Sequence, residues 1–216
     1  SDPRYTFAQA QERMKKYLVA SLKATPVDPT LLEARDALIA VAYATDEGDF
    51  QAFWKAFAKR GAGVGATGPG KTSFDNKGTK ESFVVGNEIE VVSAVLTDDA
   101  ITCDKDGILD ADEVGSVELT IRNAGAGTLE KTRAKLSTKA EGVAFADGGE
   151  FVMPKLKPFE IGKAKLKVTA RGARPIGDVE VEIAIDDPTL AVPRTIPVRV
   201  PTVRDADEAD GASTKD

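Results

Sequence analysis

The 216-residue sequence contains no histidine and a single cysteine, Cys103. Histidine is the commonest general base and zinc ligand in proteins, so its absence excludes most hydrolytic triads and every histidine-ligated metal site within the chain. One cysteine excludes an internal disulfide bond, so packing or a bound ion must hold the fold together. We therefore expect no catalytic residue and no cofactor-binding residue in this chain.

Long apolar runs and an excess of positive charge are also missing. No stretch approaches the roughly 18 apolar residues of a membrane-spanning helix. The formal net charge is -6, and the acidic excess lies after residue 83. Nucleic acids and anionic membranes select clustered positive charge, so we expect neither as a partner. The start at Ser1-Asp2-Pro3 lacks the plan of a signal peptide, which leaves a cytoplasmic protein or a piece of a longer precursor.

Apolar residues recur at helical spacing in three segments within residues 1–66. Pro26 ends the first segment, Asp28-Pro29 predicts a cap and a first turn for the second, and Asp49 predicts a cap for the third. The third segment ends at Gly61, where a left-handed residue commonly follows a helix. Three helices of about 55 residues in all bury too little surface to be stable alone. We therefore expect residues 5–60 to expose an apolar face, formed by parts of Phe7, Met14, Tyr17, Phe53, Trp54 and Phe57.

From residue 87 onward the apolar residues alternate instead, which is typical of strands. The alternation predicts strands over residues 89–95, 117–121, 164–170, 179–185 and 196–200, with shorter strands over 134–137, 143–145 and 149–152. About seven or eight short strands joined by Gly, Pro and Asp turns are typical of an antiparallel β-sandwich of immunoglobulin-like type. The Cys…Trp…Cys pattern of antibody domains is absent.

The fold class predicted from these patterns is multidomain α and β, a small helical subdomain followed by an antiparallel immunoglobulin-like β-sandwich. The helical subdomain takes residues 1–66, and a glycine-rich linker takes 67–86. The sandwich takes residues 87–203. Residues 204–216 are acidic and nearly devoid of apolar side chains, so we expect a disordered tail there.

Carboxylates are concentrated in residues 102–113, where a bend glycine separates alternating aspartates. In the twelve-residue EF-hand frame, five residues fall at ligand positions and predict one structural calcium ion: the side chains of Asp104, Asp106, Asp110 and Glu113, and the backbone carbonyl of Ile108. Thr102 stands where a carboxylate usually begins the frame, and the flanking residues are strand-like, so we expect weak affinity in the extracellular range and no EF-hand. The alternative is an acidic, solvated turn between two strands.

The helical part resembles a known family. The segments PTLLEARDALI (residues 29–39) and FWKAFAKRGAG (residues 53–63), with Ala66, are similar to the C-terminal end of fungalysin-type zinc metallopeptidases. The resemblance implies a secreted endopeptidase whose zinc-binding HExxH helix and further glutamate lie upstream. Zinc would then belong only to that absent upstream part, because none of the family's zinc ligands or catalytic residues can be placed on a chain without histidine.

The second half resembles accessory sandwich domains of bacterial secreted proteins, through residues 104–113, residues 117–121 and Asn123-Ala124-Gly125. The function predicted from both resemblances is a non-catalytic C-terminal fragment of a secreted zinc metalloendopeptidase. It would complete the helical subdomain of the catalytic unit and carry a calcium-braced sandwich, with its signal peptide upstream of Ser1. Its partner would be the missing catalytic part or another copy of the chain. The alternatives are a free-standing extracellular binding or adhesion module of immunoglobulin-like type, and an enzyme that uses a carboxylate pair.

Overall fold

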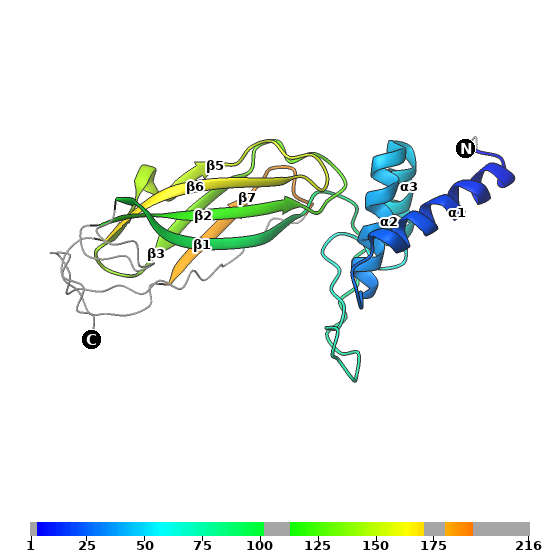
Figure 1. Cartoon of the computed structure of the whole chain (residues 1–216), viewed down its shortest axis with the longest axis horizontal. Coiled ribbons are helices and arrows are strands. Elements are labelled where there is room, and N and C mark those ends of the chain that lie inside the picture. Colours follow the sequence, from blue (N-terminus) through cyan, green and yellow to red (C-terminus); the bar gives the residue numbers. More distant parts are fainter. Residues whose placement is uncertain (1–3, 102–112, 171–179, 192–216) are drawn as a thin grey trace. The chain divides into compact units, whose positions relative to one another are not determined.

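The computed structural model describes residues 4–101, 113–170 and 180–191. The chain divides into two compact units, Ser1–Glu88 and Ile89–Asp216, which we treat separately as a helical unit and a sandwich unit (Figure 1). The helical unit contains α1 (Phe7–Ala24), α2 (Leu31–Thr45) and α3 (Glu47–Lys59). Among the described residues, no helix has the length and apolar character needed to cross a membrane.

Each helix begins at a residue whose side chain satisfies free backbone N–H groups. Thr6 caps α1 and Thr30 caps α2, each in a reciprocal capping box with the residue three positions later. Asp46 caps α3 by accepting a hydrogen bond from the Asp49 N–H. The sequence-based caps at Asp28 and Asp49 were therefore wrong. Asp28 has a left-handed φ of 51° in the connection that precedes Thr30, and Asp49 already lies inside the first turn of α3.

After α3 the chain turns back on the helical unit. Gly61 has a φ of 82°, and Ala62 N–H donates to the Phe57 carbonyl, the C-terminal arrangement expected from the sequence. Gly63 N–H donates to the Ser82 carbonyl at 2.7 Å, and Val64 N–H donates to the Val84 carbonyl at 2.8 Å. Residues 61–84 thus form a hydrogen-bonded pair of segments that packs with the helices.

The guanidinium of Arg35 joins α2 to this returning segment. Arg35 is only 7% exposed. It donates hydrogen bonds to the carbonyls of Ala62 (2.8 Å) and Gly63 (3.1 Å), and it pairs with Asp36. Its planar head also lies 5.2 Å from the ring centre of Trp54. A buried charge is stabilised here by carbonyls, a carboxylate and an aromatic face at once.

The core of the helical unit is aromatic, and it encloses side chains that we expected to be exposed. Trp54 and Tyr17 are buried, with Arg35 of α2 over the indole and Phe53 of α3 against the Tyr17 ring, so that part of the expected apolar face was wrong. Phe53 and Phe57 are half-buried. Phe7 (84% exposed) and Met14 (41% exposed) do lie at the surface, as expected.

The sandwich unit consists of two antiparallel sheets. One has the strand order β1-β2-β6-β4 and the other β5-β3-β7. The bounds of the strands are β1 Ile89–Ile101, β2 Val114–Asn123, β3 Arg133–Thr138, β4 Val143–Phe145, β5 Glu150–Val152, β6 Ile161–Ala170 and β7 Val181–Asp186. A short 3₁₀ helix, Ala146–Gly149, links β4 to β5. The expected antiparallel, immunoglobulin-like sandwich is confirmed; the strand expected over 196–200 and the acidic tail lie outside the described residues.

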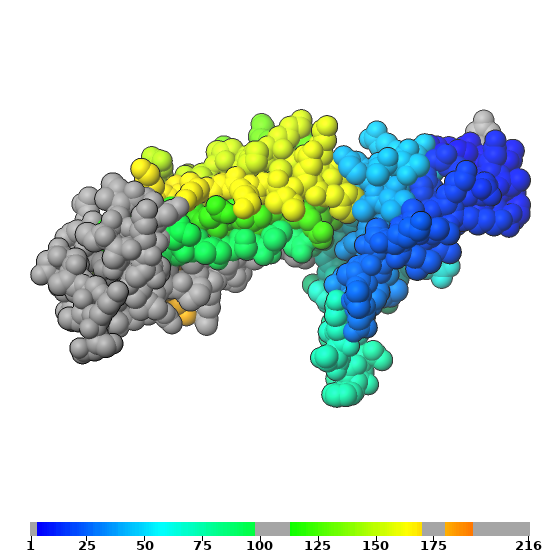
Figure 2. All heavy atoms as spheres, viewed as in Figure 1, coloured from blue at the N-terminus to red at the C-terminus, as the bar shows by residue number. Residues whose placement is uncertain are grey.

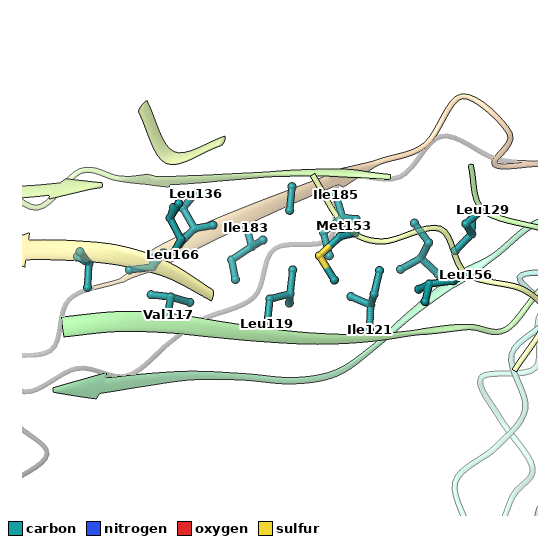
Figure 3. Packing of buried hydrophobic residues seen from close by; sticks show 14 residues of the cluster. Val117, Leu119, Ile121, Leu129, Leu136, Met153, Leu156, Leu166, Ile183 and Ile185 are labelled. Carbon is teal, nitrogen blue, oxygen red and sulfur yellow. The ribbon is translucent and has the colours of Figure 1, made fainter. Parts of the chain in front are cut away.

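Alternation along the strands places one set of side chains between the sheets. Figure 3 shows Val117, Leu119 and Ile121 of β2 pointing toward Ile183 and Ile185 of β7. All five are essentially inaccessible to solvent. Burial of each such side chain contributes about 1.5–3 kcal/mol, so this cluster is the main source of stability in the sandwich unit.

Two buried polar side chains organise loops at the rim of this core. The Asn123 amide donates to the carbonyls of Gly127 and Leu156, and its oxygen accepts from Gly125 N–H. Burial acts to raise the pKa of Asp187, but hydrogen bonds, chiefly from Thr189, outweigh it and lower that pKa. Both residues satisfy backbone groups that strands cannot reach, so we assign them a structural role.

Candidate functional site

Four of the five expected calcium ligands, Asp104, Asp106, Ile108 and Asp110, lie outside the described residues. Glu113, the fifth, is described and is 5% exposed. It stands immediately before β2, and the pair Ile101–Val114 closes the antiparallel ladder of β1 and β2. Strands therefore flank this segment on both sides, as expected. In the described ranges no group of three or more His, Cys, Asp or Glu side chains could hold a metal ion. The calcium site stays a prediction.

A pocket of about 260 Å³ lies between α1 and α3. We call it the α1–α3 groove. Small side chains form much of its lining, with an aromatic ring and a thioether beside them: Ala10, Met14, Ala52, Phe53 and Ala56. The ring of Tyr17 meets that of Phe53 edge-on, with 5.5 Å between their centres. Most of the groove is therefore an apolar depression with aromatic rings in its wall.

One end of the groove is polar and centres on Asp49. Its carboxylate accepts hydrogen bonds from Tyr17 Oη at 2.6 Å, from Arg13 Nε at 2.9 Å and from Arg4 Nη1 at 2.9 Å. A second nitrogen of Arg4 donates to Asp46 at 2.7 Å. Together these contacts connect the start of α3 to α1 and to the residues that precede α1.

Three partners in this network have pKa values that are shifted further from neutral pH. The hydrogen bond from Arg4, with that from the Asp49 N–H, lowers the pKa of Asp46 to about 2. Burial, with the hydrogen bond to Asp49, raises the pKa of Tyr17 to about 12. The pKa of Arg13 is raised by its hydrogen bond to Asp49. General acid–base catalysis works best with a pKa near the working pH, so Asp46, Tyr17 and Arg13 are poor candidates for proton transfer. Their hydrogen bonds and ion pairs instead join α1 to α3.

A row of exposed apolar side chains runs along α1 beside the groove. We call it the α1 apolar stripe: Phe7, Met14, Leu18 and Leu22. Their exposed fractions are 84%, 41%, 49% and 67%. Side chains of α1 lie at the surface of the molecule in Figure 2. Met14 belongs to both the stripe and the groove, which makes the two a continuous apolar surface.

Sequence reasoning anticipated an exposed helical face but missed the groove and its Arg–Asp network. The available signal was local: Arg13 and Tyr17 are one turn apart, and Asp46 and Asp49 are three residues apart. The pairing of these two sets spans more than 30 positions (Tyr17 to Asp49, 32) and depends on how α1 packs against α3.

Comparison with known proteins gives one family and several distant folds. The model of the fungalysin metallopeptidase family (M36) matches residues 4–66. No curated protein matches the sequence. Solved structures similar to this chain include the CARDB domain of a protein from Pyrococcus furiosus, at 9% identity over 55% of this chain and 89% of that one, with a TM-score of 0.36. A FixG-related protein from Vibrio parahaemolyticus is 13% identical over 56% of this chain and 98% of that one, with a TM-score of 0.35.

Trypsin-activated alpha-2-macroglobulin from Escherichia coli is also similar, at 12% identity and a TM-score of 0.38 over 58% of this chain, but only 8% of that one. Likeness at this level carries no argument about function. The family match does bear on zinc, which fungalysin peptidases use. The residues of this chain do not fit such a site, because the sequence has no histidine and its described part has no metal-binding cluster. Residues 4–66 are thus similar to part of a fungalysin metallopeptidase.

Proposed function

We propose that this chain is the non-catalytic C-terminal part of a secreted zinc metalloendopeptidase of the fungalysin type. In this proposal residues 1–66 complete the helical subdomain of the catalytic unit, and residues 87–203 form an accessory sandwich. The family match over residues 4–66 carries the proposal. The matched range coincides with α1, α2, α3 and the turn that follows them.

The surface of the helical unit supports a docking role in place of a catalytic one. The α1 apolar stripe leaves large side chains such as Phe7 and Leu22 mostly exposed. Contiguous exposed apolar surface commonly marks a protein contact. The catalytic part would cover this stripe, and the zinc ligands and the residues that act on the peptide would all come from that part.

The test is reconstitution of activity. The coding region upstream of Ser1, in which we expect an HExxH segment, is expressed alone and together with this chain, and cleavage of casein is measured with added Zn²⁺. We expect cleavage, or soluble upstream protein, only when both parts are present. The chain alone should cleave nothing. Chelator-sensitive cleavage by the pure chain would overturn the non-catalytic role, and full activity of the upstream part alone would overturn the completing role.

We propose further that residues 102–113 bind one structural Ca²⁺ through Asp104, Asp106, Asp110, Glu113 and the carbonyl of Ile108. Clustered carboxylates repel one another in an empty loop, and a bound cation turns that repulsion into cross-links between β1 and β2. Calcium at about 100 times its dissociation constant would add roughly 2.7 kcal/mol of stability.

Thermal melting of the chain with Ca²⁺, with Mg²⁺ and with chelator tests the calcium proposal. We expect a higher midpoint with Ca²⁺ than with either control, and a smaller increase in Glu113→Gln. Because Glu113 is buried, that variant can also lower the midpoint without any metal, so the comparison is the calcium-dependent shift within each protein. Equal midpoints of the parent chain in all three conditions would leave the acidic turn as the correct interpretation.

A further inference from the structure

We propose that the α1–α3 groove and the α1 apolar stripe bind one amphipathic helix of a partner polypeptide, with leucine-like side chains on its contact face and carboxylates along both borders. The source of that helix, the catalytic part, rests on the proposed function. The chemistry of the helix rests on the groove alone.

The size and lining of the groove favour a protruding side chain as its occupant. Its volume of about 260 Å³ lies below the roughly 300–1,000 Å³ typical of small-molecule sites. Ala10 on α1 and Ala52 and Ala56 on α3 are exposed and carry only a methyl group, so a side chain from outside can approach the helix backbones closely. A larger residue at any of these positions would fill the depression.

The length of the apolar surface favours a helix. The α1 apolar stripe extends from Phe7 to Leu22, which corresponds to roughly 22 Å along a helix axis. An amphipathic helix laid along such a groove presents its anchors at intervals of three and four residues, as helix-in-groove complexes do. About four turns of partner helix would cover the stripe and place one anchor in the groove.

The borders of this surface are basic on both sides. On α3, Lys55 and Lys59 each follow a groove-lining alanine by three positions, so they stand beside it on the helix surface. On α1, Lys15 precedes Leu18 by three positions and Leu22 by seven. All three lysines are exposed, and none forms an ion pair with another described residue. The nearby carboxylates of Asp46 and Asp49 are already paired with arginines.

This charge pattern selects among the possible occupants. A second copy of the chain related by two-fold symmetry would place lysines against lysines, which is unfavourable. An anionic bilayer would satisfy the lysines but would not enter the depression between α1 and α3. A helix with acidic borders and an apolar ridge satisfies both features.

The test uses the full chain and synthetic peptides of about 18 residues, the length that four to five helical turns require. The acidic peptide carries leucines on one face and glutamates on both borders; a second peptide has lysines in place of the glutamates; a third is a scrambled version of the first. Binding is measured by fluorescence anisotropy. We expect saturable binding of the acidic peptide, at least about tenfold tighter than that of the basic one, and weakened by added salt.

Matched variants locate the contact. Ala56→Trp fills the groove and should weaken binding by about tenfold or more, whereas Ala44→Trp, at an exposed position of α2, should leave binding unchanged. Reversal of Lys15, Lys55 and Lys59 to glutamate should transfer the preference to the basic peptide. Circular dichroism confirms that each variant is folded.

Three outcomes would overturn the inference: equal binding of acidic and basic peptides, acidic-peptide binding that survives Ala56→Trp, or a chain that instead dimerises or binds phosphatidylglycerol vesicles through this surface. These outcomes differ from failure of the proposed function. If the acidic peptide binds but proteolysis is not reconstituted, the groove is still a helix-binding site. Only the assignment of the partner helix to the catalytic part of a peptidase would then be wrong.

Discussion

Asp49→Asn tests whether the carboxylate at the polar end of the groove holds the helical unit together. The substitution keeps the shape of the side chain but removes a charge that accepts hydrogen bonds from Tyr17, Arg13 and Arg4. An amide has one uncharged acceptor oxygen in place of two charged ones, so the hydrogen bond of buried Tyr17 is weakened or lost, at a cost of about 1–3 kcal/mol. The two arginines are partly exposed and can turn to water, so each contributes less than Tyr17. We expect a loss of about 1–3 kcal/mol in the free energy of unfolding, most of it from Tyr17.

The chain offers a selective probe for this measurement. Trp54 is the only tryptophan in the sequence, and it is buried in the helical unit. Its emission during urea denaturation follows the unfolding of that unit alone. This matters if the two units unfold separately, because a single free energy of unfolding for the whole chain would then have no clear meaning. Asp75→Asn is the matched control, because the pair of Asp75 with Lys77 is exposed and should contribute little to stability.

An equal decrease of the Trp54 midpoint in Asp49→Asn and Asp75→Asn would contradict this role of the carboxylate. So would an equal loss of stability in both units of Asp49→Asn, with the sandwich unit followed by the sheet signal in far-UV circular dichroism. Either result would mean that the network is a surface feature with no special role in joining α1 to α3.

Gly63→Ala should destabilise the helical unit by about 1–3 kcal/mol, because an added Cβ would collide with the Val84 carbonyl oxygen. An unchanged urea midpoint of Trp54 emission would contradict this close packing. Ile183→Ala should cost the sandwich unit about 2–5 kcal/mol, measured by circular dichroism, and a change confined to Trp54 emission would count against separate units. The pKa of Asp46 is lowered to about 2, so its ionised form stabilises the helical unit fully at pH values above the usual pKa of a carboxyl group. This contribution is lost as the pH falls toward 2. Acid titration of Trp54 emission should show a transition in that window in the parent chain and a weaker dependence in Asp46→Asn; identical curves would refute the assignment.

The parts of the fold that could be predicted from the sequence are those that a local pattern of residues determines. The alternation of apolar residues located β4 at Val143–Phe145 without error and β3 within one residue at each end, because a strand with one buried face repeats every two residues. The cap of α2 was available too. Thr30 followed three residues later by Glu33 is a capping-box signature, and it outweighs the Asp28-Pro29 pair because both of its hydrogen bonds form.

Features that depend on contacts between distant parts of the sequence could not be predicted in this way. The order β1-β2-β6-β4 places β6 beside β2 although many residues separate them, and nothing in either strand's own pattern specifies that neighbour. The burial of Trp54 has the same origin. Its cover includes Arg35 from α2, and that contact is settled only when α2 and α3 pack together.

The contacts of Arg35 join the two segments that carry the family resemblance. Arg35 lies in the first of the two resembling segments, and Trp54, Ala62 and Gly63 lie in the second. In the folded chain the guanidinium stacks on the indole and donates to both carbonyls, so the residues that carry the resemblance meet at one buried point. A lysine there would keep the charge but lose the planar stacking and the forked donors. The two resembling segments therefore contain the contacts that fasten α2 to the end of α3. None of these contacts uses a histidine or needs a metal ion.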